Sequence, residues 1–268
     1  MDKIINPCEI CIEEACEGKF NCHCSTCKQY DKCNKFLSAT IRITTKCTQS
    51  CGHCCFECSP EKSDFMSVEM SEKIKKFIEH NHIRYLNIMG GEFYCHPQWE
   101  KILSNLLSSN VIISRIVTNG DWYKNDRNKI LKFFKNKDNF LISISKDKWH
   151  TNKYADKAFE FLQDNKIVSN ICEKLTEESI VPLGRGQLIY SNHYCMFGTF
   201  CGQPDNMYSI LIDEIGKIYK CTMGIWDYAD VDNYMFDFRK RFKEFNQVFY
   251  GTFVPNCKSC NMAFNLKR

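Results

Sequence analysis

The stretch TTKCTQSCGHC, residues 44–54, places three cysteines in a short loop that has one glycine and no proline. The β-branched run that leads into it, residues 41–45, predicts a buried strand. Cys47, Cys51 and Cys54 are spaced so that their thiolates can converge on one small inorganic centre, and cysteine thiolates are the usual ligands of iron–sulfur clusters. Three local ligands leave one iron of a four-iron cube open for a further ligand.

A zinc knuckle is the alternative interpretation of the same loop, with Cys55, Cys58 or His53 as a shared fourth ligand. The CxxxCxxC spacing directly after a strand, however, resembles the cluster loop of the radical S-adenosylmethionine (SAM) enzymes. The resemblance implies that the three cysteines bind a 4Fe–4S cluster. It also implies that the amino and carboxylate groups of SAM chelate the open iron.

Composition limits the other possibilities. A chain of 268 residues that is 44% hydrophobic can bury a large core and fits one large domain with a small one. The net charge of +4 is modest and the lysines are scattered, which argues against a nucleic-acid surface. The first residues lack a signal-peptide core and no apolar run is long enough to span a membrane, so we expect a cytoplasmic protein. Nineteen cysteines in such a protein indicate metal or redox chemistry more readily than disulfides.

The N-terminal segment, residues 8–33, is rich in cysteine and poor in large apolar side chains. A segment of this kind cannot order itself around a core, so we expect a bound metal to hold it. The pairs Cys8 with Cys11 and Cys24 with Cys27 are spaced like zinc or iron–sulfur half-sites. Zinc and a further cluster both remain open, and a flexible tail is the alternative.

From residue 40 onward, strand patterns alternate with helix patterns, which predicts right-handed βαβ crossovers and a parallel sheet. We therefore expect an α/β fold, a partial (β/α)6 TIM-type barrel at residues 39–190. The Cys-rich N-terminal segment would occupy residues 1–38, and a small Cys-rich β-hairpin extension residues 191–268. The expected strands after the first are residues 84–89, 111–117, 140–145, 167–172 and 180–183, and the expected helices are 67–81, 97–109, 125–134 and 155–164.

Unusual residues follow these strands, where parallel α/β folds place their active sites. Gly90, Gly91 and Glu92 come after the second strand and resemble the GGE motif of radical SAM enzymes, which holds the amino group of SAM. As an isolated tripeptide the same sequence is an ordinary turn. The resemblance assigns SAM contacts to two further pairs, Thr118 with Asn119 after the third strand and Ser143 with Ser145 at the end of the fourth.

Three more polar residues are expected at the same carboxyl-terminal end of the strands. Asp147 and His150 stand just beyond the fourth strand and are candidate catalytic residues, although a solvated loop acid and a helix-start histidine fit equally well. Arg185 is flanked by glycines and can offer its planar fork to a carboxylate. It resembles the arginine that many family members place near SAM or the substrate.

After residue 186 the alternation stops and cysteines return. Residues 211–221 read as a β-hairpin with an acidic turn and a glycine. Cys201, Cys221, Cys257 and Cys260 resemble the ligand set of the C-terminal extension called SPASM in its long form and twitch in its short form. The resemblance implies one auxiliary 4Fe–4S cluster, and a zinc ribbon is the alternative.

The resemblance implies a reaction as well. Radical SAM enzymes cleave SAM reductively to a 5′-deoxyadenosyl radical, which removes a hydrogen atom from the substrate, and the auxiliary cluster could accept an electron afterwards. We expect an enzyme that oxidises or cross-links a peptide, supplied with electrons by a low-potential donor such as flavodoxin or ferredoxin. One alternative is a dehydrogenase of a small alcohol or sugar-like metabolite. From another class, a non-catalytic iron–sulfur or zinc protein stays open.

Overall fold

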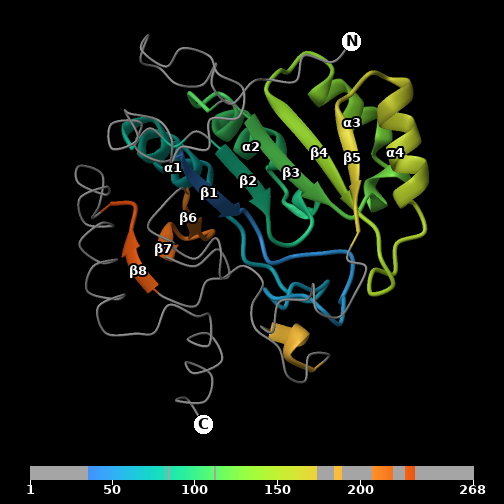
Figure 1. Cartoon of the computed structure of the whole chain (residues 1–268), viewed down its shortest axis with the longest axis horizontal. Coiled ribbons are helices and arrows are strands. Elements are labelled where there is room, and N and C mark those ends of the chain that lie inside the picture. Colours follow the sequence, from blue (N-terminus) through green and yellow to red (C-terminus); the bar gives the residue numbers. More distant parts are fainter. Residues whose placement is uncertain are drawn as a thin grey trace, which may run out of the picture.

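The computed structural model describes residues 36–81, 83, 85–111, 113–173, 184–188, 207–219 and 227–232. These residues form a mostly parallel sheet with helices packed against it (Figure 1). The strands are β1 (Phe36–Arg42), β2 (Tyr85–Met89), β3 (Ile113–Thr118), β4 (Phe140–Ser145), β5 (Ser169–Cys172), β6 (Met207–Ile212), β7 (Lys217–Tyr219) and β8 (Asp227–Asp230). The α-helices are α1 (Val68–His80), α2 (Trp99–Leu107), α3 (Arg127–Phe134) and α4 (Ala155–Asp164), and short 3₁₀ turns occupy Phe93–Cys95, Asp121–Tyr123 and Gly184–Leu188.

The strand order is β5-β4-β3-β2-β1-β6-β7-β8. Each pair from β5 across to β6 is parallel, and only β7 and β8 run antiparallel to their neighbours. The expected α/β class and partial TIM-type barrel are therefore confirmed. The strand expected at residues 180–183 lies outside the described residues. The sixth parallel strand of the sheet is instead β6, which belongs to the predicted hairpin and pairs with β1.

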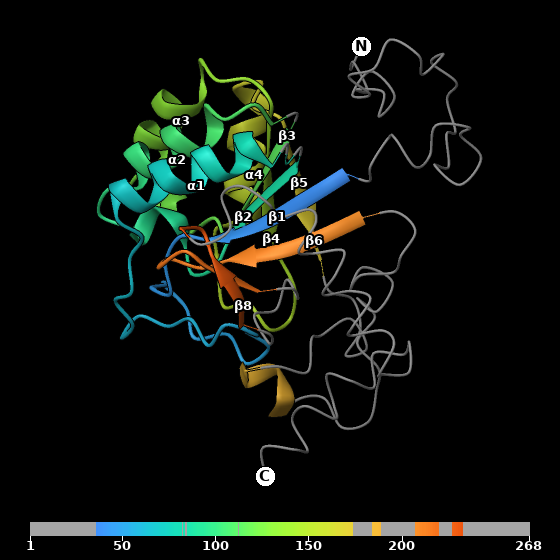
Figure 2. The ribbon, with the colours of Figure 1, turned by 90° about the vertical axis from the view of Figure 1, so that its left-hand side faces the viewer.

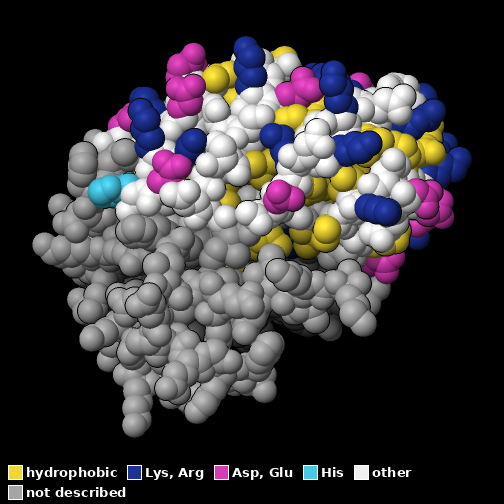
Figure 3. All heavy atoms as spheres, turned by 90° about the horizontal axis from the view of Figure 1, so that it is seen from above, with side chains coloured by type: hydrophobic (Ala, Val, Ile, Leu, Met, Phe, Trp, Pro, Cys, Tyr) yellow, Lys and Arg dark blue, Asp and Glu magenta, His cyan; other side chains and the backbone are white. Residues whose placement is uncertain are grey.

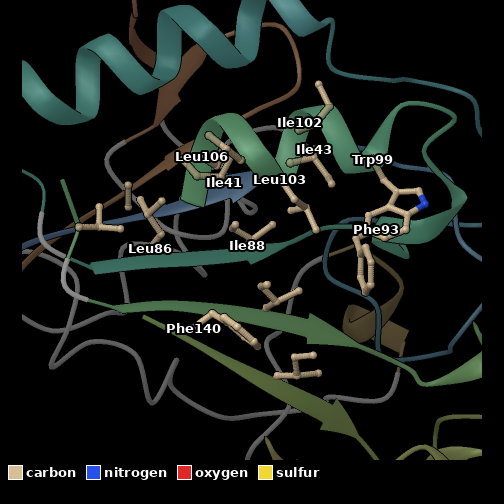
Figure 4. Packing of buried hydrophobic residues seen from close by; sticks show 14 of the residues in the cluster. Ile41, Ile43, Leu86, Ile88, Phe93, Trp99, Ile102, Leu103, Leu106 and Phe140 are labelled. Carbon is tan, nitrogen blue, oxygen red and sulfur yellow. The ribbon is translucent and has the colours of Figure 1, made fainter. Parts of the chain in front are cut away.

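All four helices lie on one side of the sheet (Figure 2). On that side β1 and β2 present Ile41, Leu86 and Ile88, which are almost completely buried. Figure 4 shows these side chains beneath Ile102 and Leu103 of α2, in the main hydrophobic core. The period-2 alternation of each strand sends its other side chains to the opposite face, which is the face that holds the site.

The predicted helices are confirmed, with small shifts at their ends. Ser67 caps α1 as expected, because its hydroxyl accepts a hydrogen bond from the backbone N–H of Met70 at 3.0 Å. The helix at residues 155–164 has the expected bounds, whereas α2 and α3 begin two residues later than expected. The expected hairpin is also present, since β6 and β7 pair antiparallel and Gly216 in their turn has a φ of +83°.

The first strand differs from its prediction. The β-branched run suggested a strand at residues 41–45, but β1 ends at Arg42, where its ladder with β2 reaches Met89. Beyond this point Thr44 forms an isolated bridge with Phe65, and its carbonyl accepts from the N–H of Gly91 at 2.8 Å. After Arg42 the chain leaves the sheet, and the loop that follows β1 is hydrogen-bonded to the loop that follows β2.

The described part of the surface carries charges of both signs. Seen from above in Figure 3, lysine and arginine side chains are interspersed with acidic ones over it. No described helix combines the length and the apolar character needed to cross a bilayer.

Candidate active site at the carboxyl ends of the strands

A cavity of about 590 Å³ lies on the face of the sheet opposite the helices, against the cysteine loop. Its size falls in the range of small-molecule sites. It gathers most of the site residues expected from the sequence that lie in the described ranges. These lining residues are Cys47, Cys51, Cys54, Gly90, Gly91, Glu92, Thr118, Asn119, Ser145, Asp147 and His150. Ser143 and Arg185 are described as well, but they do not line the cavity.

The cysteine loop is held by backbone hydrogen bonds to the segment that returns from it. The N–H of Cys47 donates to the carbonyl of Ser59 at 3.1 Å, and the N–H of Thr45 donates to the carbonyl of Asp64, also at 3.1 Å. The hydroxyl of Thr45 adds a 2.6 Å bond to the Asp64 carboxylate. The loop therefore has a fixed shape that depends on residues as far along as 64.

The three thiols lie close enough to influence one another. Burial raises the pKa of Cys47 well above its usual range and that of Cys51 to about 11, and the charge of Cys54 adds to both effects. A hydrogen bond from Cys58 lowers the pKa of Cys54 to about 6. Three thiolates this close together at a partly buried position would repel one another and need positive charge beside them, which iron supplies. The donor set therefore fits a cluster with three cysteine ligands.

Gly91 packs directly against this loop. A Cβ built at Gly91 would stand 1.9 Å from the carbonyl oxygen of Lys46, so no other residue fits there without moving the loop. Beside it, the N–H of Glu92 donates to that same carbonyl at 2.8 Å. The two glycines thus let the turn after β2 approach the backbone of the cysteine loop, and this contact explains them without reference to a ligand.

Glu92 is 1% exposed, and both of its carboxylate oxygens accept hydrogen bonds within the protein. Thr118 Oγ1 donates to Oε1 at 2.6 Å, and the N–H of Asn119 donates to Oε2 at 2.7 Å. Burial raises the pKa of Glu92 to about 8, although these two bonds work in the opposite direction. The carboxylate therefore joins the ends of β2 and β3, a structural connection that its position in the motif did not reveal.

Arg185 contacts the cysteine loop from outside the cavity. Its Nε donates to the carbonyl of Cys51 at 2.9 Å and its Nη2 to the carbonyl of Cys58 at 2.6 Å. Its own N–H donates to the carbonyl of Cys54 at 3.1 Å. The structure therefore gives Arg185 a role in fastening the loop, and its contact with SAM or substrate stays a prediction.

Asp147 and His150 form a tight pair beside the cavity. Asp147 Oδ1 lies 2.8 Å from His150 Nδ1 and also accepts from the backbone N–H groups of Trp149 and His150. Burial works to raise the pKa of Asp147, but the hydrogen bond from His150 and the charges of His150 and His53 hold it below its usual range. The ligand atoms of His53, Asp147 and His150 all lie within 4.8 Å of one another. The pair can orient an imidazole toward the cavity.

Two further residues of the site were not predicted from the sequence. Gln49 bridges three segments, since its Oε1 accepts from Cys51 Sγ at 3.4 Å and from the N–H of Thr151 at 3.0 Å, while its Nε2 donates to Asp121 at 2.9 Å. Arg115 lines the cavity from the middle of β3. The only hint of Arg115 was a charged residue inside an otherwise apolar and small-polar strand.

The proposed auxiliary ligands Cys201, Cys221, Cys257 and Cys260, and the N-terminal candidates Cys8, Cys11, Cys24 and Cys27, lie outside the described residues.

Comparison with known proteins agrees with this geometry. The family model described as Radical SAM superfamily matches residues 41–179. Over 111 residues the chain is 31% identical to the antilisterial bacteriocin subtilosin biosynthesis protein AlbA of Bacillus subtilis (strain 168). That match covers 41% of this chain and 24% of AlbA, so the chain aligns with about a quarter of this relative.

Two solved structures share the fold. BtrN in complex with AdoMet and 2-DOIA has a TM-score of 0.57 at 12% identity, over 83% of this chain and 92% of BtrN. Native anSMEcpe with bound AdoMet and Cp18Cys peptide has a TM-score of 0.51 at 13% identity, over 77% of this chain and 81% of that one. At such identities the likeness concerns the fold alone.

Proposed function

Because this chain belongs to the radical SAM superfamily, whose members are enzymes, we propose that it oxidises or cross-links residues of a peptide substrate. Membership implies a 4Fe–4S cluster and SAM as cofactors. When bound, they supply the electron and the 5′-deoxyadenosyl radical that removes a hydrogen atom from the substrate. The observation that carries the proposal is the convergence of the three loop cysteines and the glycine turn on one cavity.

In this proposal each part of the site has a separate task. Cys47, Cys51 and Cys54 hold the cluster through three of its irons, which leaves one iron for SAM. The backbone of residues 90–92 and the side chains of Asn119 and Ser145 line the space beside them and position SAM. The cavity wall excludes water from the radical, so that hydrogen is taken from the substrate.

The peptide substrate is supported by the match to AlbA, which is a bacteriocin biosynthesis protein. The match spans 111 residues of this chain and leaves most of AlbA without a counterpart here. We keep the peptide as the substrate class and leave its sequence open. A low-potential donor such as flavodoxin or ferredoxin would reduce the cluster.

The proposal also includes the Cys-rich ends of the chain. Cys201, Cys221, Cys257 and Cys260 would bind one auxiliary cluster that takes an electron from the substrate radical. Residues 8–33 would bind zinc or a further cluster. Electron removal at the auxiliary cluster is what makes net oxidation the expected outcome.

Anaerobic assays with dithionite test the first step. Replacing Cys47, Cys51 and Cys54 with alanine should abolish 5′-deoxyadenosine formation, because no ligand set for the SAM-binding cluster remains. Cys95→Ala removes a thiol outside the loop and should leave formation intact. Undiminished formation in the triple variant would overturn the cluster assignment.

Deuterium transfer tests the substrate class. A uniformly deuterated peptide pool should place deuterium in 5′-deoxyadenosine, because the hydrogen atom comes directly from the substrate. Transfer from a deuterated pool of sugar alcohols, with none from peptides, would replace the peptide proposal with the small-alcohol dehydrogenase.

A further inference from the structure

The floor of the cavity carries a row of polar side chains on three neighbouring strands. Thr40 of β1 is the register partner of Asn87 of β2, which is in turn the partner of Arg115 of β3. All three line the cavity. Parallel strands covered on both faces are ordinarily apolar throughout, because a buried polar group costs free energy unless it is bonded. A polar row at this depth therefore indicates a surface that meets a polar ligand.

Arg115 is fixed at one end of its guanidinium group and open at the other. Its Nε donates to Ser143 Oγ at 2.8 Å, and that hydroxyl donates to Asn170 Oδ1 at 2.5 Å. Among the described residues, Arg115 makes no ion pair with an acid and no second side-chain hydrogen bond. A half-buried cation on a cavity wall is thus held in one orientation while its two Nη groups keep their donors for something else.

Asn87, which lies beside Arg115, also has hydrogen-bonding capacity that the described residues do not use. Its Nδ2 contacts Met89 Sδ at 3.2 Å, and thioether sulfur is a weak acceptor. Its Oδ1 is buried and has no hydrogen-bond partner in the described part of the chain. Buried amides are normally satisfied, and this oxygen can only accept, so it gains by bonding to an N–H or O–H group of a ligand that enters the cavity.

We propose that Arg115 and Asn87 form a subsite that binds a carboxylate of the substrate, such as the side chain of an acidic residue in a peptide. The open fork of Arg115 matches the two oxygens of a carboxylate, and Asn87 Nδ2 adds a further donor, while Asn87 Oδ1 is free to accept from an N–H of the substrate. The acid would anchor the substrate at the floor, below the position where hydrogen is removed. This proposal rests on the proposed function only in assigning the carboxylate to the substrate.

The carboxylate of SAM is the other source of the same chemistry, and the position of Arg115 argues against it. Arg115 lies three residues before Thr118, the end of β3. At roughly 3.3 Å per residue this places it about 10 Å below the strand end. The cysteine loop, where SAM would chelate iron, follows the carboxyl end of β1. Arg115 is therefore placed to bind a different molecule.

The test uses cluster-loaded protein with saturating SAM and N-acetylglutamate as the probe, followed by saturation-transfer NMR under anaerobic conditions. N-acetylglutamine has the same shape without the charge and should give no signal. Arg115→Gln should weaken N-acetylglutamate binding about tenfold or more, the loss expected for a charge-assisted bond. Arg127→Gln removes an arginine of α3 and should leave binding unchanged. Iron content should stay at the parent level in both variants, and 5′-deoxyadenosine formation should stay at the parent level in Arg127→Gln.

Three results would overturn the subsite. Equal N-acetylglutamate binding in the parent and in Arg115→Gln would show that the guanidinium is not the receptor. A weaker affinity for SAM with unchanged probe binding would assign the carboxylate to SAM. Should Arg115→Gln misfold, Arg115→Lys is used instead, because lysine keeps the charge without the planar fork. Parent-like binding of N-acetylglutamate by Arg115→Lys would overturn the two-pronged contact on which the subsite is argued. Loss of 5′-deoxyadenosine in the parent itself would count against the proposed function and not against the subsite.

Discussion

At Gly91 the chain has no space for a side chain, because the Lys46 carbonyl occupies the place where a Cβ would lie. We predict that Gly91→Ala pushes the turn after β2 away from the cysteine loop and breaks the two backbone hydrogen bonds between them. Strain of this kind costs about 1–3 kcal/mol. The expected result is less iron per chain after reconstitution and faster loss of iron to a chelator, measured by colorimetric iron assay.

Gly216→Ala is the matched control for this variant. Gly216 also has a crowded Cβ position, and it has in addition a left-handed φ that Gly91 does not have, but it lies in the β6–β7 turn. It should lower stability while leaving iron retention unchanged. If Gly91→Ala held its iron as firmly as the parent, the contact with Lys46 would have no bearing on the cluster.

Glu92 gives the apoprotein a pH dependence of a definite sign. Its folded pKa is about 8 against an ordinary 4.5, so between these values the folded chain keeps a proton that the unfolded chain has lost. The free energy of unfolding should therefore fall as pH rises from about 4.5 to 8, by up to roughly 1.4 kcal/mol per unit. Glu92→Gln stays neutral and should remove this part of the slope.

Urea denaturation of the cluster-free protein across this pH range measures the effect. The parent and Glu92→Gln share their cysteines and histidines, so the difference between their slopes isolates Glu92. If the free energy of unfolding had the same dependence on pH in the parent and in Glu92→Gln, the Glu92 carboxylate would be ionised in the folded protein.

At the residue scale, the sequence predicted the residues that line the cavity better than the residues that hold them in place. The cysteine spacing and the Gly-Gly-Glu turn have local signatures, and the structure brings them to one cavity. Gln49, Arg115 and the inward carboxylate of Glu92 act through partners that are distant in sequence. Their roles depend on which strands become neighbours, and no local pattern encodes that.

At the scale of elements, the turn Gly184–Leu188 fastens the cysteine loop through Arg185. We predict that Arg185→Gln loses both side-chain bonds to the Cys51 and Cys58 carbonyls, each worth about 1.5–3 kcal/mol because the donor is charged. The loop should then release iron to a chelator roughly tenfold faster or more.

Stopped-flow absorbance of the cluster in the presence of chelator gives the rate. Arg127→Gln again supplies an arginine control away from the loop. A parent-like rate in Arg185→Gln would mean that the backbone bonds alone fix the loop.

Helices were predicted more closely than the ends of strands. The apolar periodicity of α1 and the polar Ser67 before it are local, and both the helix and its cap were found. The bounds of β1 depend on its neighbours β2 and β6, which set where pairing begins and ends. Isoleucine and threonine continue past Arg42 in sequence, so composition alone extended that strand into the loop.

For the whole molecule, the proposed auxiliary cluster is the part that would decide between oxidation and other outcomes. We predict that replacing Cys257 and Cys260 with alanine removes about four irons per chain, the content of one such cluster. 5′-Deoxyadenosine formation should persist, because the cysteine loop is untouched. Deuterium transfer from the peptide pool should also persist, while oxidised peptide should no longer accumulate.

Iron quantification and mass spectrometry of the peptide read the two effects separately. Loss of zinc in place of iron would favour the zinc ribbon. If the variant lost four irons but still formed oxidised peptide at the parent level, the auxiliary cluster would have a structural role and no role in the oxidation.

The pairing of β1 with β6 has a consequence for how the protein is made. Phe36–Arg42 is synthesised early, but its neighbour Met207–Ile212 leaves the ribosome only after every helix of the described barrel. Until then β1 presents one unpaired edge, a template for association with other chains. Contacts between segments so far apart in sequence also slow folding. Nascent chains that stop before residue 207 should therefore aggregate.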